Sequence, residues 1–392
     1  MKKLTVGVLF GGRSPEHEVS IITGIQVLHA LKKSNYDALP IYITKGGQWI
    51  VGDESFYKPE TFRNSKDAVK GQSVVYFPPD YKLSSLIKEP SGVRFLKGLE
   101  KLKVDVFFPA FHGKYGEDGS VQGVFEMAGV AYVGCGVQAS ALGMDKVVSK
   151  IIAESIGIPV LKSGWILKSV WKESYSEAFK NIKHLSYPLF IKPARLGSSI
   201  GIKRVENKKE LIEALNVAFF YDTKVMIEEC LVDAIEINIS LMGNNPYEMS
   251  ACEQPIASKN VLSFQDKYLS KKGPSEGMAS AKRIVPAPIK KKTKYLIEEY
   301  SRKFFAEIGG EGLARIDYLL SQDEKEIYFN EINTLPGSVA FYLWKEIGVT
   351  FDQLVDKLVK LAIKRKEDAS KLITTFDNNI LEGFSGVKGI KK

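Results

Sequence analysis

Residues 313–337 read LARIDYLLSQDEKEIYFNEINTLPG, and this stretch decides the fold around the candidate site. Apolar residues recur through 313–320 and 326–332, and a polar turn around Asp323 separates the two runs. Apolar runs of this length on either side of a polar turn predict two strands that pair as an antiparallel hairpin.

Four polar side chains lie on these two predicted strands. Side chains two residues apart point to the same face of a strand, so Arg315 shares a face with Asp317, and Glu331 with Asn333. If the hairpin brings these faces together, two carboxylates and an amide oxygen meet, which is a ligand set that suits Mg²⁺. Arg315 beside them suits a phosphate or a developing negative charge. The same pattern also fits a polar strand face that only meets solvent.

A second candidate site is the loop 192–201, which reads KPARLGSSIG and follows a short predicted strand at 188–192. Backbone N–H groups that glycine and serine leave accessible can surround phosphate oxygens. The loop is not a Walker motif, because no Gly-Lys-Ser/Thr ends it, and it also fits an ordinary glycine hairpin. Lys146 opens a predicted helix, where a lone lysine is usually a surface charge.

The first 130 or so residues alternate between apolar runs and helical patterns. Strands are predicted at 4–10, 38–44 and 104–111, and helices at 16–31 and 122–128. Such alternation predicts an α/β fold with a parallel, Rossmann-like sheet. Residues 51–100 are polar and contain several prolines, so we expect them to form a surface excursion from this domain.

Two glycine-containing loops follow strands of this predicted sheet: GGRSPEHEVS at 11–20 and HGKYGEDG at 112–119. Open α/β sheets bind ligands at the carboxyl ends of their strands, so both loops are candidate substrate contacts. The dinucleotide pattern G-x-G-x-x-G is absent, which argues against a Rossmann dehydrogenase. His112 also fits an ordinary turn histidine.

The rest of the chain contains further strand and helix patterns. Strands are predicted at 225–228 and 236–242, and helices at 140–157, 295–308 and 351–364. Residues 259–285 are polar and rich in Gly, Ser and Lys, so we expect a mobile loop there. The stretch after Arg365 is weakly patterned, and we expect it to be peripheral or frayed.

The composition fits a soluble protein with more than one domain, since 392 residues are too many for one ordinary core. We expect no membrane span, because no run of about 18 uncharged apolar residues exists. The short apolar run at 4–10 leads into glycines without a cleavage site, which predicts a first strand and no export signal. The 3 cysteines lack pair spacing, which argues against disulfides and zinc and favours a cytosolic protein.

The formal net charge of +9 suits either nucleic acid or an anionic small substrate. The lysines are scattered, and no basic helix is interleaved with aromatic residues. We therefore expect small-molecule partners, and neither a nucleic acid nor a membrane.

Together, these elements resemble the ATP-grasp superfamily and, within it, the D-alanine–D-alanine ligase family. The matching stretches run in the family's order from near residue 4 to about residue 364; they are 11–20, 112–119 with 122–123, 139–146, 191–201, 267–268, 315–317 and 330–337. The resemblance implies an ATP-grasp fold with an N-terminal Rossmann-like domain at 1–134, a central domain at 135–229, a C-terminal domain at 230–364 and a tail at 365–392.

The resemblance also implies roles at an ATP site. Lys146 and Lys192 would hold the phosphates, and two Mg²⁺ ions, or Mn²⁺, would bind with Glu331 bridging them. The implied metal ligands are Asp317, Glu331 and Asn333. The implied ATP contacts are Lys146, Lys192, Ser199, Glu228 or Glu229 with the backbone at Cys230 and Leu231 for the adenine, Glu236 for the ribose, and Asn330.

The first D-alanine would meet residues of the N-terminal domain and the glycine–serine loop. Glu16 would bind its ammonium group, His112 would lie nearby, and Ser198 and Tyr268 would form a hydrogen-bonded link from Glu16 to the loop at 259–285.

The chemistry would depend on three further groups. Arg315 and the N–H of Gly337 would stabilise the oxyanion, and Lys267 would enter from the loop at 259–285, which would close as a lid and keep water from the intermediate.

The implied reaction is ATP-dependent ligation of two D-alanines through an acyl phosphate, for peptidoglycan precursors, by a homodimer in the cytoplasm. Two departures from the family pattern concern the acceptor. The segment between Tyr268 and Pro286 is longer than usual, and the stretch after Gly337 is shorter and lacks the serine that normally contacts the second substrate, which leaves Ser338 as a replacement. The alternatives are a ligase that uses a different amine and a nucleotide-binding regulator without turnover.

Overall fold

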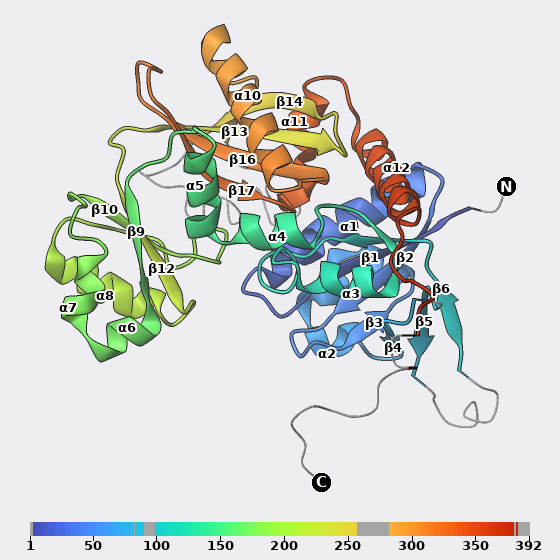
Figure 1. Cartoon of the computed structure of the whole chain (residues 1–392). Helices are drawn as coiled ribbons and strands as arrows, with labels where there is room; N and C mark the ends of the chain where they lie inside the picture. Colours follow the sequence, from blue (N-terminus) through green and yellow to red (C-terminus); the bar gives the residue numbers. More distant parts are fainter. Residues whose placement is uncertain (1–2, 82, 90–98, 257–281, 380–381, 383–392) are drawn as a thin grey trace.

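The described residues form three β-sheets, which lie in different regions of the molecule in Figure 1. The computed structural model describes residues 3–81, 83–89, 99–256, 282–379 and 382. The first sheet has strand order β6-β5-β4-β3-β2-β1-β7-β8, the second β11-β10-β12-β9, and the third β15-β14-β13-β16-β17. The expected α/β architecture with a Rossmann-like N-terminal part is confirmed.

The parallel core of the first sheet consists of β1 (Thr5–Gly11), β2 (Asp37–Ile43), β7 (Val106–Pro109) and β8 (Ala131–Tyr132). Helices α1 (His17–Lys33) and α3 (Ser120–Ala128) connect these strands. β1 is an almost continuous apolar run, and α1 buries residues at helical spacing against it, among them Val27, Leu28 and Leu31. The carboxyl ends of β1 and β7 lead into the two glycine-containing loops, as predicted.

The expected surface excursion at 51–100 is wrong in part. Within it, and at its margins, β3 (Trp49–Val51), β4 (Ser73–Tyr76), β5 (Ser85–Lys88) and β6 (Lys101–Lys103) extend the first sheet as antiparallel strands. The short elements η1 (Glu54–Tyr57), η2 (Pro59–Arg63) and α2 (Ser65–Ala68) lie between β3 and β4. These strands are too short to give a clear period-two pattern, and the fully buried Phe56 supplies the apolar contact that the polar composition conceals.

The second sheet is antiparallel and contains β9 (Ser163–Leu167), β10 (Leu189–Pro193), β11 (Lys203–Val205) and β12 (Lys224–Glu229). Helices α6 (Lys168–Glu173), α7 (Tyr175–Lys180) and α8 (Lys208–Ala218) pack on it around a separate apolar cluster. This small layer lies at the left in Figure 1, and the glycine–serine loop leaves the end of β10.

The third sheet carries the predicted hairpin. Its strands are β13 (Ile235–Gly243), β14 (Glu248–Pro255), β15 (Arg283–Ile284), β16 (Gly312–Leu320) and β17 (Ile327–Asn333). One face buries alternating residues such as Ile237, Ile239 and Ile316 against α4 (Val137–Met144), α5 (Lys146–Ser155) and α10 (Lys291–Glu307). The opposite face carries the polar residues of the candidate site.

Two helix boundaries differ from the predictions. The single helix expected at 140–157 is broken at Asp145, whose carboxylate accepts hydrogen bonds from Val147 N at 3.1 Å and Val148 N at 3.3 Å and so caps α5. After η5 (Gly337–Ala340) and α11 (Phe341–Lys345), the last helix, α12 (Phe351–Ala369), runs five residues past the predicted end at 364. Arg365 on α12 donates to the backbone oxygens of Gly134 and Tyr132, so this residue is anchored.

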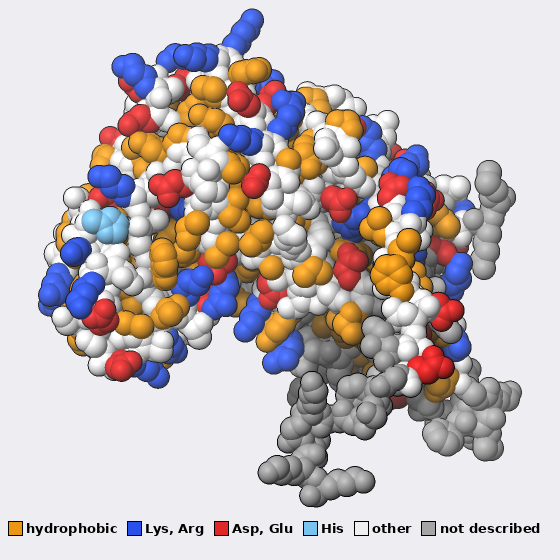
Figure 2. Space-filling view, viewed as in Figure 1, with side chains coloured by type: hydrophobic (Ala, Val, Ile, Leu, Met, Phe, Trp, Pro, Cys, Tyr) orange, Lys and Arg blue, Asp and Glu red, His pale blue; other side chains and the backbone are white. Residues whose placement is uncertain are grey.

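The charged surface is mixed. Figure 2 shows lysine and arginine side chains distributed over the visible face among acidic ones. No helix in the described parts of the chain combines the length and apolarity that a membrane crossing requires. All three cysteines are free thiols, which agrees with the expected absence of a disulfide framework.

Candidate functional site

The hairpin brings its two polar faces together in the predicted way. Asp317 on β16 is paired with Glu331 on β17, and Arg315 is paired with Asn333. The register shifts by a β-bulge immediately after Asp317, so the strict alternation of the two strands ends beside these residues. The four side chains that the sequence placed on two separate faces therefore form one group.

An arginine holds the central carboxylate of this group. Arg315 Nε and Nη2 donate to the two oxygens of Asp317, each at 2.7 Å, and Asn333 Nδ2 donates to Asp317 Oδ2 at 3.2 Å. Both members of the ion pair are buried. Burial alone would lower the pKa of Arg315, but Asp317 outweighs it and keeps that pKa well above the ordinary value, so the guanidinium stays charged.

A first lysine reaches the group from α5. Lys146 follows the capping residue Asp145, which fixes it in the first turn of the helix. Its ammonium lies 3.0 Å from Glu331 Oε2 and donates to the backbone oxygen of Leu196 at 2.8 Å. The side chain is buried, so it is not the surface charge that a lone lysine in this position usually is.

A second lysine comes from the small sheet. Lys192, on β10, donates to Glu228 Oε2 at 2.6 Å and to Asn330 Oδ1 at 3.3 Å. It thereby connects β10 and β12 of the second sheet with β17 of the third. The two predicted phosphate lysines thus lie on different elements, and both face the acidic hairpin.

Sequence reasoning missed a third lysine, Lys150. Its ammonium lies 2.5 Å from Glu228 Oε1 and donates to the backbone oxygen of Phe329 at 3.0 Å. The four-residue spacing from Lys146 puts both side chains on one face of a helix, and this was a signal that could have found it. Lys150 and Glu228 are almost completely buried.

Burial and ion pairing shift pKa values within the triad of Lys150, Glu228 and Lys192. Burial is the largest influence on Lys150, and it lowers the pKa of that ammonium although Glu228 acts in the opposite direction. Burial alone would raise the pKa of Glu228, but the two lysines outweigh it and lower that pKa below the ordinary value. The ion pairs therefore keep the carboxylate charged in an interior position.

A cavity of about 400 Å³ adjoins this triad between the second and third sheets. Residues predicted to contact ATP are prominent in its wall: Lys192, Ser199, Glu228, Cys230, Leu231, Glu236 and Asn330, together with Glu331. Glu229 is not in the wall, and its Oε1 accepts from Ser186 N at 2.9 Å. Both oxygens of Glu228 face lysines, whereas Cys230 and Leu231 line the cavity beside them.

A carboxylate of the N-terminal domain meets the glycine–serine loop. Ser198 Oγ donates to Glu16 Oε1, although 182 residues separate the two in the chain. The loop bends sharply here, because Ser198 and Ser199 have φ of 52° and 58°. A Cβ on Gly113 would lie 2.8 Å from Glu16 Oε2, and one on Gly197 would lie 3.1 Å from it, so both glycines let backbone approach this carboxylate.

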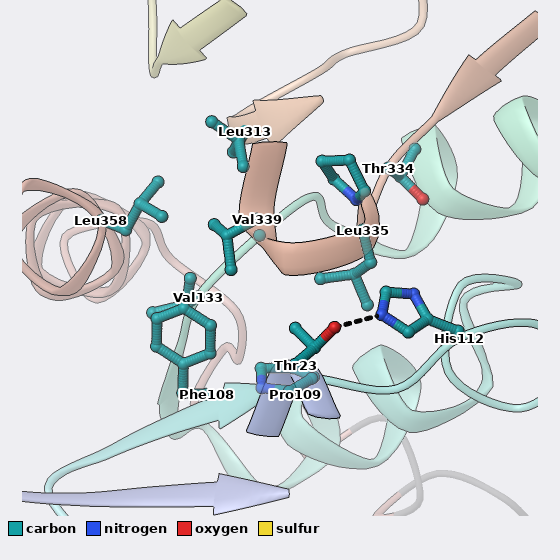
Figure 3. A pocket seen from close by; sticks show the side chains of 13 residues that line it. Thr23, Phe108, Pro109, His112, Val133, Leu313, Thr334, Leu335, Val339 and Leu358 are labelled. Carbon is teal, nitrogen blue, oxygen red and sulfur yellow. Dashed lines mark hydrogen bonds between the residues drawn. The ribbon is translucent and has the colours of Figure 1, made fainter. Parts of the chain in front are cut away.

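His112 is buried and lines two cavities, one of about 230 Å³ together with Gly12 and Tyr115, and a much smaller one. Its place near the first substrate stays a prediction. Its Nε2 is 2.9 Å from Thr23 Oγ1, which also accepts from Ser338 N at 3.1 Å. Figure 3 shows His112 pointing to Thr23 beside Leu335, at a cavity of only about 10 Å³. A cavity of this size holds at most one water molecule, so it is a packing gap between domains and not a substrate site.

Three predictions in this region concern residues beyond those just described. Gly337 begins the turn η5, four residues before α11 begins at Phe341. Lys267 and Tyr268, and nearly all of the loop expected at 259–285, lie outside the described residues. The described residues contain no group of three or more His, Cys, Asp or Glu side chains able to hold a metal, because the candidate set combines two carboxylates with an amide.

A second polar cluster, which was not predicted from the sequence, adjoins Arg315. Glu253 on β14 lies 2.9 Å from Arg283 on β15, and it accepts hydrogen bonds from Asn238 and Tyr342 at 3.2 Å each. These residues come from four elements and share no sequence motif. Burial and Glu253 raise the pKa of Tyr342 to about 12.

Comparisons with known proteins agree over nearly the whole chain. A model described as "D-ala D-ala ligase N-terminus" matches residues 5–135, and one described as "D-ala D-ala ligase C-terminus" matches residues 152–360. The chain is 37% identical to a D-alanine–D-alanine ligase of Natranaerobius thermophilus, covering 97% of this chain and 100% of the relative. It is also 37% identical to one of Thermosipho africanus, covering 97% of this chain and 98% of the relative.

Solved structures of two ligases also match this chain over most of its length. A VanG D-Ala:D-Ser ligase from Enterococcus faecalis superposes with a TM-score of 0.77 at 31% identity, covering 92% of this chain and 100% of that one. A D-alanine–D-alanine ligase from Coxiella burnetii superposes with a TM-score of 0.76 at 25% identity, covering 95% and 97% of the two chains.

Proposed function

Since the chain belongs to the D-alanine–D-alanine ligase family, we propose that it joins two D-alanines to D-alanyl-D-alanine while ATP is converted to ADP and phosphate. The observation that carries this proposal is the meeting of three groups: the acidic hairpin, the lysines from α5 and β10, and the Glu16–Ser198 contact. The dipeptide is a building block for peptidoglycan.

The first step transfers the γ-phosphoryl group of ATP to the carboxylate of one D-alanine, giving an acyl phosphate and ADP. We propose that Glu16, held by Ser198, binds the ammonium of this donor. Lys146 and Lys192 neutralise the phosphate charge, since Lys192 lines the cavity between the sheets and Lys146 contacts Glu331, which lines the same cavity. Phosphoryl transfer depends mainly on such positioning and charge neutralisation.

The oxygen donors of Asp317, Glu331 and Asn333 fit Mg²⁺ or Mn²⁺, and we propose that they hold two such ions with ATP. Divalent ions, when bound, supply further charge neutralisation at the β- and γ-phosphates. Arg315 and Lys146 balance the charge of the two carboxylates, which offsets the cost of removing them from water.

In the second step, the amine of the acceptor forms a bond to the acyl carbon, and the bond from that carbon to the phosphate oxygen breaks. Phosphate leaves with the electron pair, and the amine loses a proton. The carbonyl oxygen carries negative charge in between. We propose that Arg315, whose charge Asp317 maintains, and the N–H of Gly337 stabilise it.

The nucleotide would occupy the 400 Å³ cavity. The adenine would lie against the backbone at Cys230 and Leu231, and the ribose against Glu236, with the phosphates directed to Lys192 and Glu331. We further propose that the protein works in the cytoplasm, where ATP is supplied, and that it forms a homodimer by analogy with its family.

Product identification with purified protein, ATP, Mg²⁺ and D-alanine tests the proposal. We expect ADP, phosphate and D-alanyl-D-alanine in equal amounts. ATP binding without turnover of any amino acid would contradict the proposal and favour the nucleotide-binding regulator.

The shortened stretch after Gly337 supports a second candidate, which is ligation of D-alanine to a different amine. A panel of acceptors that includes D-serine, the amino acid in the name of the similar VanG D-Ala:D-Ser ligase, separates the two candidates. Mixed dipeptide in excess over D-alanyl-D-alanine at equal acceptor concentrations would favour the second.

A further inference from the structure

The row of metal-ligand candidates continues across the third sheet. Glu331 is paired with Asp317, Asp317 with Asn238 on β13, and Asn238 with Glu253 on β14. Paired residues of neighbouring strands lie on the same face of a sheet. The polar row therefore runs over four strands and reaches Glu253, beside the edge strand β15.

An arginine occupies the far end of this row. Arg283 on β15 lies 2.9 Å from Glu253 Oε2, and its guanidinium carbon is 3.7 Å from the centre of the Tyr342 ring. Glu253 is 1% exposed, so its charge needs the arginine. The plane of a guanidinium stacks well on an aromatic face while its edges donate hydrogen bonds.

Two contacts of Glu253 connect this arginine with the hairpin. Glu253 accepts hydrogen bonds from Tyr342 and from Asn238, and Asn238 is the strand partner of Asp317. Tyr342 reaches this position through the short turn after Gly337, in which Ser338, Val339 and Ala340 have φ of 51°, 55° and 48°. Three consecutive left-handed residues turn the chain sharply before α11 begins.

The second step needs a cation near the carboxylate of the acceptor. The acceptor is an amino acid, so its carboxylate enters a site that already holds the negatively charged acyl phosphate. Lys146 and Lys192 are assigned to the phosphates, and Arg315 contacts both oxygens of Asp317. A cation on the acceptor side would offset the repulsion.

We propose that Arg283 binds the carboxylate of the acceptor amino acid and thereby selects acceptors that carry a carboxylate next to the amine. This inference rests on the proposed ligase function. A guanidinium has five N–H donors on two edges, so it can hold a protein carboxylate and a substrate carboxylate together. Glu253 and Tyr342 fix its orientation, and Asn238 connects that orientation to Asp317 and the hairpin.

Hydroxylamine provides the experiment, because it is an acceptor without a carboxylate. It attacks the same acyl phosphate and releases phosphate, and the product is D-alanine hydroxamate. The ratio of dipeptide to hydroxamate therefore reports the acceptor site separately from the donor half-reaction. We would measure both products for the wild-type protein, Arg283→Met and Arg283→Lys.

Arg283→Met is expected to lower dipeptide formation at subsaturating D-alanine by about 10- to 100-fold, as loss of a charged hydrogen bond implies, with hydroxamate formation unchanged. Arg283→Lys keeps the charge and the partner of Glu253, so it should fold and give an intermediate ratio. Arg302→Met, on the far helix α10, removes an exposed arginine and should change neither product.

Unchanged dipeptide formation in Arg283→Met would overturn the inference. So would an equal loss of both products in Arg283→Met and Arg283→Lys, because Arg283 would then only support the fold. A wild-type protein that gives neither product would instead refute the proposed function. If Arg283→Met fails to fold, the ratio for Arg283→Lys decides: a wild-type ratio contradicts the inference.

Discussion

The nucleotide side and the acceptor side of the site are built in different ways. On the nucleotide side, Lys146 and Lys150 come from one helical turn, and Lys192 ends a strand whose neighbour carries Glu228. On the acceptor side, Glu253, Arg283 and Tyr342 come from two strands and a short helix. Local motifs thus supply the charges that we propose for phosphate, whereas tertiary packing assembles the groups that we propose for the second substrate.

The burial of charge also differs between the two sides. Glu228 is held by two lysines in the interior, so removal of either lysine changes both charge and packing. On the acceptor side, the charge of the Glu253 carboxylate is shared by one arginine, Arg283, and two neutral donors, Asn238 and Tyr342. We therefore expect changes on the nucleotide side to affect stability first and changes on the acceptor side to affect product choice first.

Lys150→Met should have the largest effect on stability. It leaves Glu228 with one cation in a buried position, which typically costs about 3–5 kcal/mol. The double variant Lys150→Met/Glu228→Leu should recover part of this loss, because no unpaired charge remains. Urea unfolding measures both, with Lys360→Met as an exposed-pair control that should cost at most about 1 kcal/mol. Equal losses in the single and double variants would mean that packing, and not charge, stabilises this side.

Arg315→Met tests the boundary between the two sides. Loss of an oxyanion donor typically lowers kcat by about 10²–10³-fold, and here dipeptide and hydroxamate formation should fall together. ATP affinity, measured by calorimetry with a non-hydrolysable analogue, should change little. A selective loss of dipeptide would show that Arg315 belongs to the acceptor side alone.

The pH dependence of stability should report the ion pairs of Glu228 on the nucleotide side. The pKa of Glu228 is lowered from the ordinary value of 4.5, so its charged form stabilises the fold fully above about pH 4.5. That stability is lost as the pH falls through the lower, folded-state pKa. Urea unfolding from pH 7 to pH 3 should therefore show a steeper loss for the wild type than for Lys150→Met/Glu228→Leu. Parallel curves would argue against the triad as a source of acid sensitivity.

Ser338→Ala should have the smallest effect. Ser338 is the serine that remains within the shortened stretch. However, its backbone N–H donates to Thr23, and the residue is buried in the turn. Dipeptide and hydroxamate rates should stay near those of the wild type. A selective loss of dipeptide would transfer the carboxylate contact from Arg283 to Ser338 and reverse the comparison.

Sequence reasoning predicted the polar faces of the hairpin well because its residues lie on regular elements. The period of two on the strands put Arg315 with Asp317 and Glu331 with Asn333, and the hairpin register followed from the polar turn at Asp323. Lys150 was missed although its spacing from Lys146 is helical. Residues 51–100 were misjudged because short edge strands carry too few apolar positions to show their period.

The sequence by itself determined the family, the alternation of strands and helices in the Rossmann-like part, and the polar faces that pair in the hairpin. Tertiary structure alone decided which carboxylates the lysines hold, how α12 returns to the first sheet, and where Arg283 meets Glu253 and Tyr342. The physical reason is distance along the chain. Periodicity reports the neighbours of a residue within its own element, whereas the partners of a buried charge are set by how separate elements pack.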